Sequence, residues 1–259
     1  MQYWKAHYKD ALHDTDIQIV NTEGVYGTDP LSFTLDNIKF HGTGPGSFEL
    51  ADKTQYQEAA KKFCIFKFGG NDTKSHHTSP YTYELQRYEL EVEIPISIVR
   101  KRDNCLIRGM LFIALEYHEY DGTRHSSRAI CDGEETAYHD TLEVSEFSLY
   151  IDGICYKYAG KEIWFEDALR DICAQMKNDY YIKSCFTCQY SDYSPYGSDD
   201  YGTMLCYCRH KNDCLNVNSK AEYFRFLGDK DCDARQETYL CDQYCLRNQA
   251  GGYRGYVDI

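Results

Sequence analysis

The chain has 259 residues and 13 cysteines, and its 28 Lys and Arg against 41 Asp and Glu give a net charge of −13. No run approaches the roughly 18 to 20 apolar residues of a membrane helix, and the charged first residues do not resemble a secretory signal. An odd cysteine count without an export signal argues against a disulfide framework, so we expect a cytoplasmic protein with reduced thiols. The apolar fraction of 42% excludes a disordered chain.

Charge and cysteine content divide the chain into two parts. Residues 1–180 carry 19 basic and 30 acidic residues, net −11, whereas residues 181–259 carry 9 and 11, net −2. Five cysteines are scattered through the first part, and the other eight lie between Cys185 and Cys245. These shifts predict an acidic domain over residues 1–180 and a small cysteine-rich subdomain over residues 181–259.

The first part is dominated by strand patterns. Apolar and polar residues alternate over most of four segments, which indicates strands with one buried face, namely 31–40, 63–68, 90–99 and 142–150. Segment 106–120 has a denser apolar centre, as in a strand covered on both sides. With turn-forming glycines between the segments, the pattern predicts an antiparallel sheet or sandwich. The expected fold class is β-rich α+β.

Two helices follow from local signals. Phe165, Ala168, Leu169, Ile172, Cys173 and Met176 recur at intervals of 3 and 4 residues, with acids in the first turn. This spacing predicts an amphipathic helix that closes the sheet domain. A second helix is expected to begin at Ser219, where Ser219 and Glu222 match a capping box, and to end at Gly228.

The cysteine cluster contains the sharpest motif. Cys185 and Cys188 are three positions apart, and after 17 further residues come Cys206 and Cys208. Two thiolates at the first spacing can hold one ion in a tight turn, and a distant pair completes a tetrahedral zinc site with Zn–S bonds of about 2.3 Å. Cys206 and Cys208 lie in an expected strand, so both side chains would face one side. Cys241, at the end of an expected strand 236–241, is another candidate ligand.

We therefore predict one structural Zn²⁺ ion in the C-terminal subdomain. Free structural thiols are the main alternative, and a mixed site that includes His210 stays open. A redox role is less favoured, because a loop rather than a helix follows Cys188. So many thiols in one place favour a closed site over a catalytic one.

Four sequence runs carry a resemblance. They are CFTCQYSDYSPYG at 185–197, GTMLC at 202–206, QETYLC at 236–241 and GYRG at 252–255. Together they resemble an uncharacterised bacterial protein family of unknown function, over about the last 75 residues, whereas the first part is similar only in layout. In such proteins the cysteines at Cys185, Cys188, Cys206 and Cys241 recur, so the resemblance implies that these four bind the metal. Cys208 and Cys245 are alternates, and no reaction is implied.

Histidines and acids of the first part offer a different function, a metal-dependent hydrolytic or nucleic-acid-processing enzyme. The candidate residues are His76, His77, His118, His125, His139, Glu116 and Glu119. Their spacing matches no known metal motif such as His-Glu-x-x-His, so solvated loops are the simpler interpretation. Convergence of at least three of them in one pocket would favour the enzyme.

Carboxylates suggest a binding surface. Glu89, Glu91 and Glu93 alternate along one strand, and Asp132, Glu134 and Glu135 cluster in a turn. The simpler interpretation is a solvated face that discourages strand pairing at an edge. The functional interpretation is a landing site for a basic protein, where negative charge raises the association rate. Nucleic acid is not expected as a partner, because its phosphates require cations.

The function favoured by these patterns is not enzymatic. We expect an intracellular, zinc-stabilised protein-binding module of the immunity or antitoxin type, which binds a basic partner through its acidic surface. The metal-dependent enzyme is the alternative, and a zinc-dependent scaffold without such a partner is a third hypothesis.

Overall fold

The computed structural model describes residues 1–23, 29–71, 78–119, 127–131, 134–138, 140–160, 165–195 and 201–247. Side chains are described for these residues except 68–71, 78–80, 117–119, 127–131, 134–138 and 140–142. The chain forms two compact units. The first contains the described parts of Met1–Thr22, Asp29–Val92 and Ile113–Ser145, and the second is built mainly from those of Glu93–Phe112 and Glu146–Ile259. The expected boundary between residues 180 and 181 stays a prediction.

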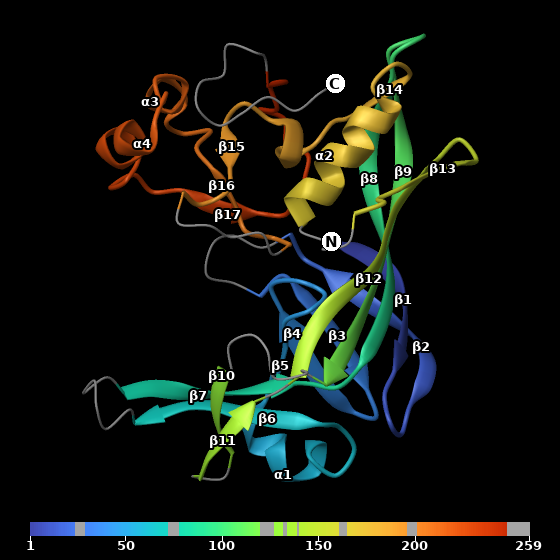
Figure 1. Ribbon diagram of the computed structural model, residues 1–259, viewed down its shortest axis with the longest axis vertical. Coiled ribbons are helices and arrows are strands. Elements are labelled where there is room, and N and C mark those ends of the chain that lie inside the picture. The colour runs from blue at the N-terminus through green and yellow to red at the C-terminus, as the bar shows by residue number, and fades with distance from the viewer. Residues whose placement is uncertain are drawn as a thin grey trace. The chain divides into compact units, whose positions relative to one another are not determined.

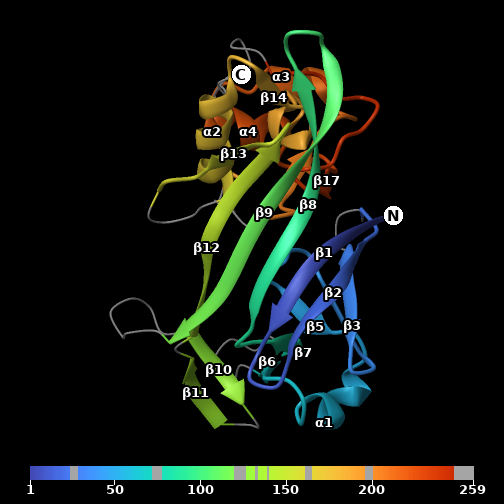
Figure 2. The ribbon, with the colours of Figure 1, turned by 90° about the vertical axis from the view of Figure 1, so that its right-hand side faces the viewer.

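The fold is β-rich and antiparallel, as predicted (Figures 1 and 2). In the described part of the chain, the large sheet has 12 strands in the order β13-β12-β9-β8-β1-β2-β3-β4-β5-β7-β6, with β14 paired to β8. The strands are β1 Gln2–Lys9, β2 Asp14–Asn21, β3 Leu31–Leu35, β4 Ile38–Gly42, β5 Phe48–Leu50, β6 Ile65–Asn71, β7 Thr78–Leu85, β8 Glu89–Arg100, β9 Cys105–Glu119, β12 Asp140–Ile151, β13 Ile154–Lys157 and β14 Tyr180–Ile182. A separate pair joins β10 Ser127–Cys131 to β11 Glu134–Tyr138.

The predicted strand 31–40 is a hairpin rather than one strand. β3 and β4 pair through Phe33 and Phe40, and the chain reverses at Asp36 and Asn37, whose φ angles are 49° and 64°. Asn and Asp tolerate this left-handed conformation, which a tight two-residue hairpin turn requires. The alternation of apolar and polar residues hid the turn, because the first residue after it, Ile38, is again apolar and buried.

Aromatic side chains form much of the core of the first unit. The ring of Phe33 stacks on Phe40 at 5.1 Å and meets Phe48 edge-on at 4.9 Å. Tyr8 stacks on Tyr88 at 5.7 Å, and both are almost completely buried. Two short helical segments, η1 Lys53–Gln55 and α1 Tyr56–Ala59, precede β6.

The predicted closing helix is confirmed in the second unit. α2 spans Phe165–Met176, and its buried residues are the six that the spacing indicated. The helix packs against β13 and β14. Its exposed face carries an ion pair between Glu166 and Arg170 at 2.7 Å.

The C-terminal part contains a small sheet and two short helices. The strands are β15 Ser191–Asp192, β16 Met204–Cys206 and β17 Asp233–Arg235, and the helices are α3 Lys211–Leu215 and α4 Lys220–Phe226. The Ser219 side chain accepts from the Glu222 N–H, so the predicted cap is confirmed. Tyr207, Cys214, Val217, Tyr223 and Leu227 form a buried cluster. The expected strand 236–241 was wrong, because the chain bends into a turn closed by the Tyr239 N–H and the Gln236 carbonyl.

No helix in the described part of the chain is long and apolar enough to cross a membrane.

Candidate functional site

A tight turn positions the first two predicted metal ligands. η2 spans Cys185–Thr187, and the Cys188 N–H donates to the Cys185 carbonyl at 3.1 Å. The C-terminal segment holds this turn on both sides. The Cys185 N–H donates to Tyr239 O at 2.7 Å, and the Gln189 N–H donates to Cys245 O at 2.8 Å. Residues 239 and 245 therefore bring Cys241, which lies between them, beside the turn.

The other three predicted ligands lie near Cys185. Burial raises the pKa of the Cys185 thiol well above its ordinary value, and the thiols of Cys206, Cys188 and Cys241 raise it further. A neighbour shifts a pKa in this way only when it lies close. Cys185, Cys188 and Cys206 are buried, and Cys241 is half-buried. Three segments distant in sequence thus contribute thiols to one cluster, which we call the thiol cluster (Cys185, Cys188, Cys206 and Cys241).

The alternates occupy different positions. Cys208 lies outside β16, in a turn that the His210 N–H closes on Tyr207 O at 2.8 Å, so the expected strand ends earlier. Burial raises the pKa of Cys206 to about 12, and the neighbouring Cys208 lowers it through its N–H and raises it through its thiol. Cys245 is exposed, and His210 pairs with Asp231 at 2.8 Å.

None of the cysteines with described side chains forms a disulfide. Within the described ranges, no group of three or more His, Cys, Asp or Glu side chains is already arranged to hold a metal ion. The thiol cluster is therefore a set of neighbouring thiols rather than a converged tetrahedron.

Two buried charged residues that sequence reasoning missed support the cluster. Arg247 is 3% exposed, and its guanidinium donates to the Cys188 carbonyl at 3.2 Å and to that of Ser191. Glu237 is fully buried and accepts from Tyr193 Oη at 3.0 Å and from the Gly202 N–H at 2.7 Å. No local pattern marks either residue, since both are charged side chains in a polar segment.

A row of His and acidic residues crosses the first unit, and no local sequence pattern marks it. His41 on β4 lies opposite Glu49 on β5, which lies opposite Glu84 on β7. Directly opposed residues have Cβ atoms about 4.5 to 5.5 Å apart and share a face. Asp29 Oδ2 lies 2.6 Å from His41 Nδ1. We call Asp29, His41, Glu49 and Glu84 the His–acid row.

The electrostatics of the row are unfavourable at its acidic end. Burial raises the pKa of Glu84, and the negative charge of Glu49 raises it further. Thr82 and Gln86 donate to the Glu84 carboxylate only at 3.4 Å. Among the residues described, neither Glu49 nor Glu84 forms an ion pair, so a like-charge contact stands uncompensated by a cation.

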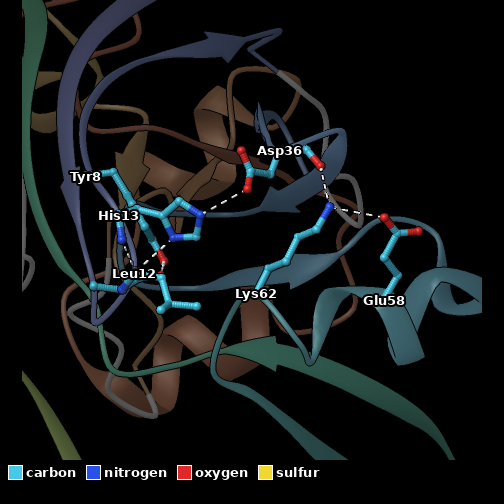
Figure 3. A network of polar contacts seen from close by, with 7 residues as sticks. Tyr8, Leu12, His13, Asp36, Glu58 and Lys62 are labelled. Carbon is cyan, nitrogen blue, oxygen red and sulfur yellow. Dashed lines mark hydrogen bonds and ion pairs between the residues drawn. The ribbon is translucent and has the colours of Figure 1, made fainter.

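A second polar network closes the turn between β1 and β2 (Figure 3). Asp10 Oδ1 accepts from the N–H groups of Leu12 and His13 at 2.8 Å and contacts His13 Nδ1 at 2.9 Å. The His13 ring stacks on Phe63 with ring centroids 4.7 Å apart, and its Nε2 lies 3.4 Å from Asp36. Because Asp10 is used by the backbone of its own turn, this network holds the hairpin together.

Most histidines of the enzyme hypothesis lie outside the described residues. This holds for His76, His77, His125 and His139, and for the side chains of His118 and Glu119. Glu116 is described and half-buried. The proposed convergence therefore stays untested.

The acidic candidates are only partly described. Glu89 and Glu91 are exposed on β8 and Glu93 is half-buried, as the alternation predicted. Glu89 is paired with Lys9 at 2.7 Å. Asp132 and the side chains of Glu134 and Glu135 lie outside the description.

Comparison with known protein families identifies the chain. The model of a family of unknown function, DUF6304, matches residues 2–191. The chain belongs to this family. The DUF6304 match extends from β1 through the Cys185–Cys188 turn and ends before Cys206 and Cys241. The match thus covers the strand-rich first part, whose resemblance to an uncharacterised family was one of layout only. The motifs after residue 191 lie outside the match. No curated protein and no solved structure matches the chain significantly.

Proposed function

We propose that this DUF6304 protein is an intracellular, zinc-stabilised protein-binding module of the immunity or antitoxin type, which binds a basic partner through its acidic surface. The observation that carries the proposal is the thiol cluster, in which Cys188, Cys206 and Cys241 all act on the thiol of Cys185. Free thiols in place of disulfides support an intracellular location.

The donor set of the thiol cluster fits zinc. Soft thiolates select zinc among the common divalent ions, and four of them give the closed tetrahedral site typical of structural zinc. Without a cation, burial raises the pKa of the Cys185 and Cys206 thiols and opposes their ionisation. Binding would release their protons and draw the sulfurs together by side-chain rotation, since each Zn–S bond is about 2.3 Å long. The ion would supply folding energy to a subdomain with a small apolar core.

The acidic surface of the first unit supports a basic partner. Glu91 on β8 is exposed and has no ion pair within the described ranges. Glu49 and Glu84, which lie opposite each other on β5 and β7, add negative charge that a cationic side chain would neutralise. The excess of 11 acidic residues over residues 1–180 gives a field that steers a basic protein toward this part of the chain.

Metal analysis of the purified protein tests the zinc site. We expect one zinc per chain and a lower melting temperature after chelation. Cys185→Ser and Cys241→Ser should lose the metal. Cys105→Ser should retain it, because this exposed thiol is distant in sequence from the thiol cluster. Absence of zinc, with a melting temperature that chelation leaves unchanged, would refute the metal site.

Co-purification from the native host tests the partner. A basic protein should be recovered at low salt and lost at high salt, because salt screens exposed charges. Replacing Glu49, Glu84 and Glu91 by Gln should weaken recovery in the same way. A zinc-containing protein that recovers no such partner would instead support the scaffold hypothesis.

The His–acid row favours a second candidate, acid–base catalysis of hydrolysis. Asp29 pairs with His41 at Nδ1, and no described residue is hydrogen-bonded to Nε2, so that atom is available to a substrate. A carboxyl with a raised pKa next to an ionised one is a common acid–base pair. A panel of p-nitrophenyl esters, phosphates and glycosides tests this candidate. It fails if His41→Asn hydrolyses every substrate as fast as the native protein does.

A further inference from the structure

We propose that one face of the sheet in the second unit is an interface between two copies of this chain, which pack face to face with their strands running in opposite directions. This outer face is formed by β8, β9 and β12, which lie side by side in the large sheet (Figure 2). Its residues are Glu93, Pro95, Leu106, Arg108, Met110, Phe112 and Tyr150. The dimer does not depend on the proposed zinc site.

The opposite face of the same strands is covered by α2. The side chains of Ile98 and Leu149 fill the space beside Gly109, so these three residues share one face. Phe147 lies two positions before Leu149 on that face, and its ring meets that of Phe165 on α2 with centroids 4.9 Å apart. Successive side chains of a strand point to opposite faces. The residues of the outer face therefore point away from α2.

The outer face is apolar and accessible. Leu106 is 55% exposed and Tyr150 is 45% exposed. Between the ends of the face, Pro95, Met110 and Phe112 are half-buried. Contiguous exposed apolar side chains with a polar rim mark protein interaction sites. Two sheets stack through faces of this kind at a separation of about 10 Å.

Two opposite charges lie toward the two ends of this face. Gly109 is level with residues 96–98 of β8, which are three to five positions from Glu93. Its neighbour Arg108 therefore lies roughly 10 to 17 Å from Glu93 along the strands. Arg108 is exposed and Glu93 is half-buried, and neither forms an ion pair within the described ranges. Each charge is thus available to an opposite charge on a partner.

This arrangement of charge selects a second copy as the occupant. An acidic partner would match Arg108 and be repelled by Glu93, and a basic partner would do the reverse. A two-fold axis that runs between the faces, across the strands, places Arg108 of each copy over Glu93 of the other, with Met110 near the axis. The other charges of the outer side, Glu146 and Lys157, already pair with each other at 2.9 Å.

Sedimentation velocity of the full chain over a concentration series tests the dimer. Native protein should self-associate. Arg108→Glu and Glu93→Arg should each raise the dissociation constant of the dimer by about ten-fold or more, because like charges then face each other. An equimolar mixture of the two variants should associate like native protein, since each copy again meets the opposite charge. Arg102→Glu, at an exposed cation in the turn before β9, is the matched control and should associate normally.

Three results would overturn the proposed dimer. The first is native protein that stays monomeric up to about 0.1 mM. The second is a dimer that neither charge variant weakens, and the third is a mixture of the variants that fails to associate, since either would show that positions 108 and 93 do not meet. Thermal melting of each variant, followed by circular dichroism, separates loss of association from loss of folding.

Discussion

Glu49 and Glu84 lie directly opposite each other on β5 and β7, and no cation among the described residues pairs with either carboxylate. Burial and the charge of Glu49 raise the pKa of Glu84 above 4.5. Ionised Glu84 therefore destabilises the folded state. The stability associated with its protonated form is fully present below its unfolded pKa and is lost as pH rises through the raised folded pKa.

Glu84→Gln should accordingly stabilise the protein at pH 7. Opposed like charges cost about 0.2 to 1 kcal/mol, which corresponds to a rise in melting temperature of roughly 1 to 3 °C for a chain of this size. The gain should vanish near pH 4, where Glu84 is protonated in both states. Glu91→Gln, at an exposed position on β8, is the control and should change neither value. Equal melting temperatures of native and variant protein at pH 7 would contradict the repulsion.

Asp10 should contribute stability with the opposite pH dependence. Burial opposes its ionisation, but hydrogen bonds from the Leu12 N–H, the Tyr8 hydroxyl and His13 together lower its pKa below 3.8. Its stabilisation is therefore present above the unfolded pKa and is lost as pH falls through the lowered folded pKa. Asp10→Asn should cost about 1.5 to 3 kcal/mol at pH 7, the value of hydrogen bonds to a charged group.

Urea unfolding at pH 7 and pH 3 measures this difference. Asp36→Asn is the matched control, because Asp36 is exposed and lies 3.4 Å from the same His13 ring. It should have little effect at either pH. A loss from Asp10→Asn that is no smaller at pH 3 would show that shape rather than charge matters at this turn.

Glu237 should be among the residues least tolerant of substitution. The fully buried carboxylate accepts from Tyr193 Oη and from the Gly202 N–H. A glutamine amide offers one acceptor and turns its NH₂ toward a donor, so Glu237→Gln should cost about 1.5 to 3 kcal/mol. Tyr193→Phe removes only one of these bonds and should cost about 1 kcal/mol. Chemical denaturation that ranks Tyr193→Phe as the more damaging change would refute this account.

His7 should titrate above its ordinary pKa of 6.5. The largest cause is the hydrogen bond to Asp16, which desolvation opposes and Asp14 supplements. The resulting stabilisation is present below pH 6.5 and is lost as pH rises through the raised folded pKa. NMR titration of the ring protons should show a larger fall in pKa for Asp16→Asn than for Asp14→Asn. High salt should reduce both effects because the groups are exposed.

Local patterns predicted the regular elements well. The pattern of buried residues from Phe165 to Met176 follows from the 3.6-residue period of a helix, and the start of α4 follows from the hydroxyl of Ser219. Both signals depend on neighbours only three or four positions away. The acidic alternation along β8 likewise depends only on the two-residue period of a strand. The hairpin of β3 and β4 was missed because a two-residue turn leaves the alternation almost unbroken.

The thiol cluster was partly determined by sequence. The spacing of Cys185 and Cys188 implies one tight turn, whatever the rest of the chain does. Which distant thiols join them depends on how the C-terminal segment crosses that turn, through the hydrogen bonds to Tyr239 and Cys245. Those bonds bring Cys241 into the group acting on Cys185 and leave Cys245 exposed.

The sequence by itself determined most of the strands and helices, the uneven distribution of charge, and the first half of the predicted metal-binding motif, because each depends on residue types or on neighbours within a few residues. Only the tertiary structure decided that His41, Glu49 and Glu84 share a row, or that Cys208 lies outside the strand that ends at Cys206. Strand register and the path of the C-terminal segment are set by packing over the whole unit, and a shift of one residue would send every side chain in the row to the opposite face.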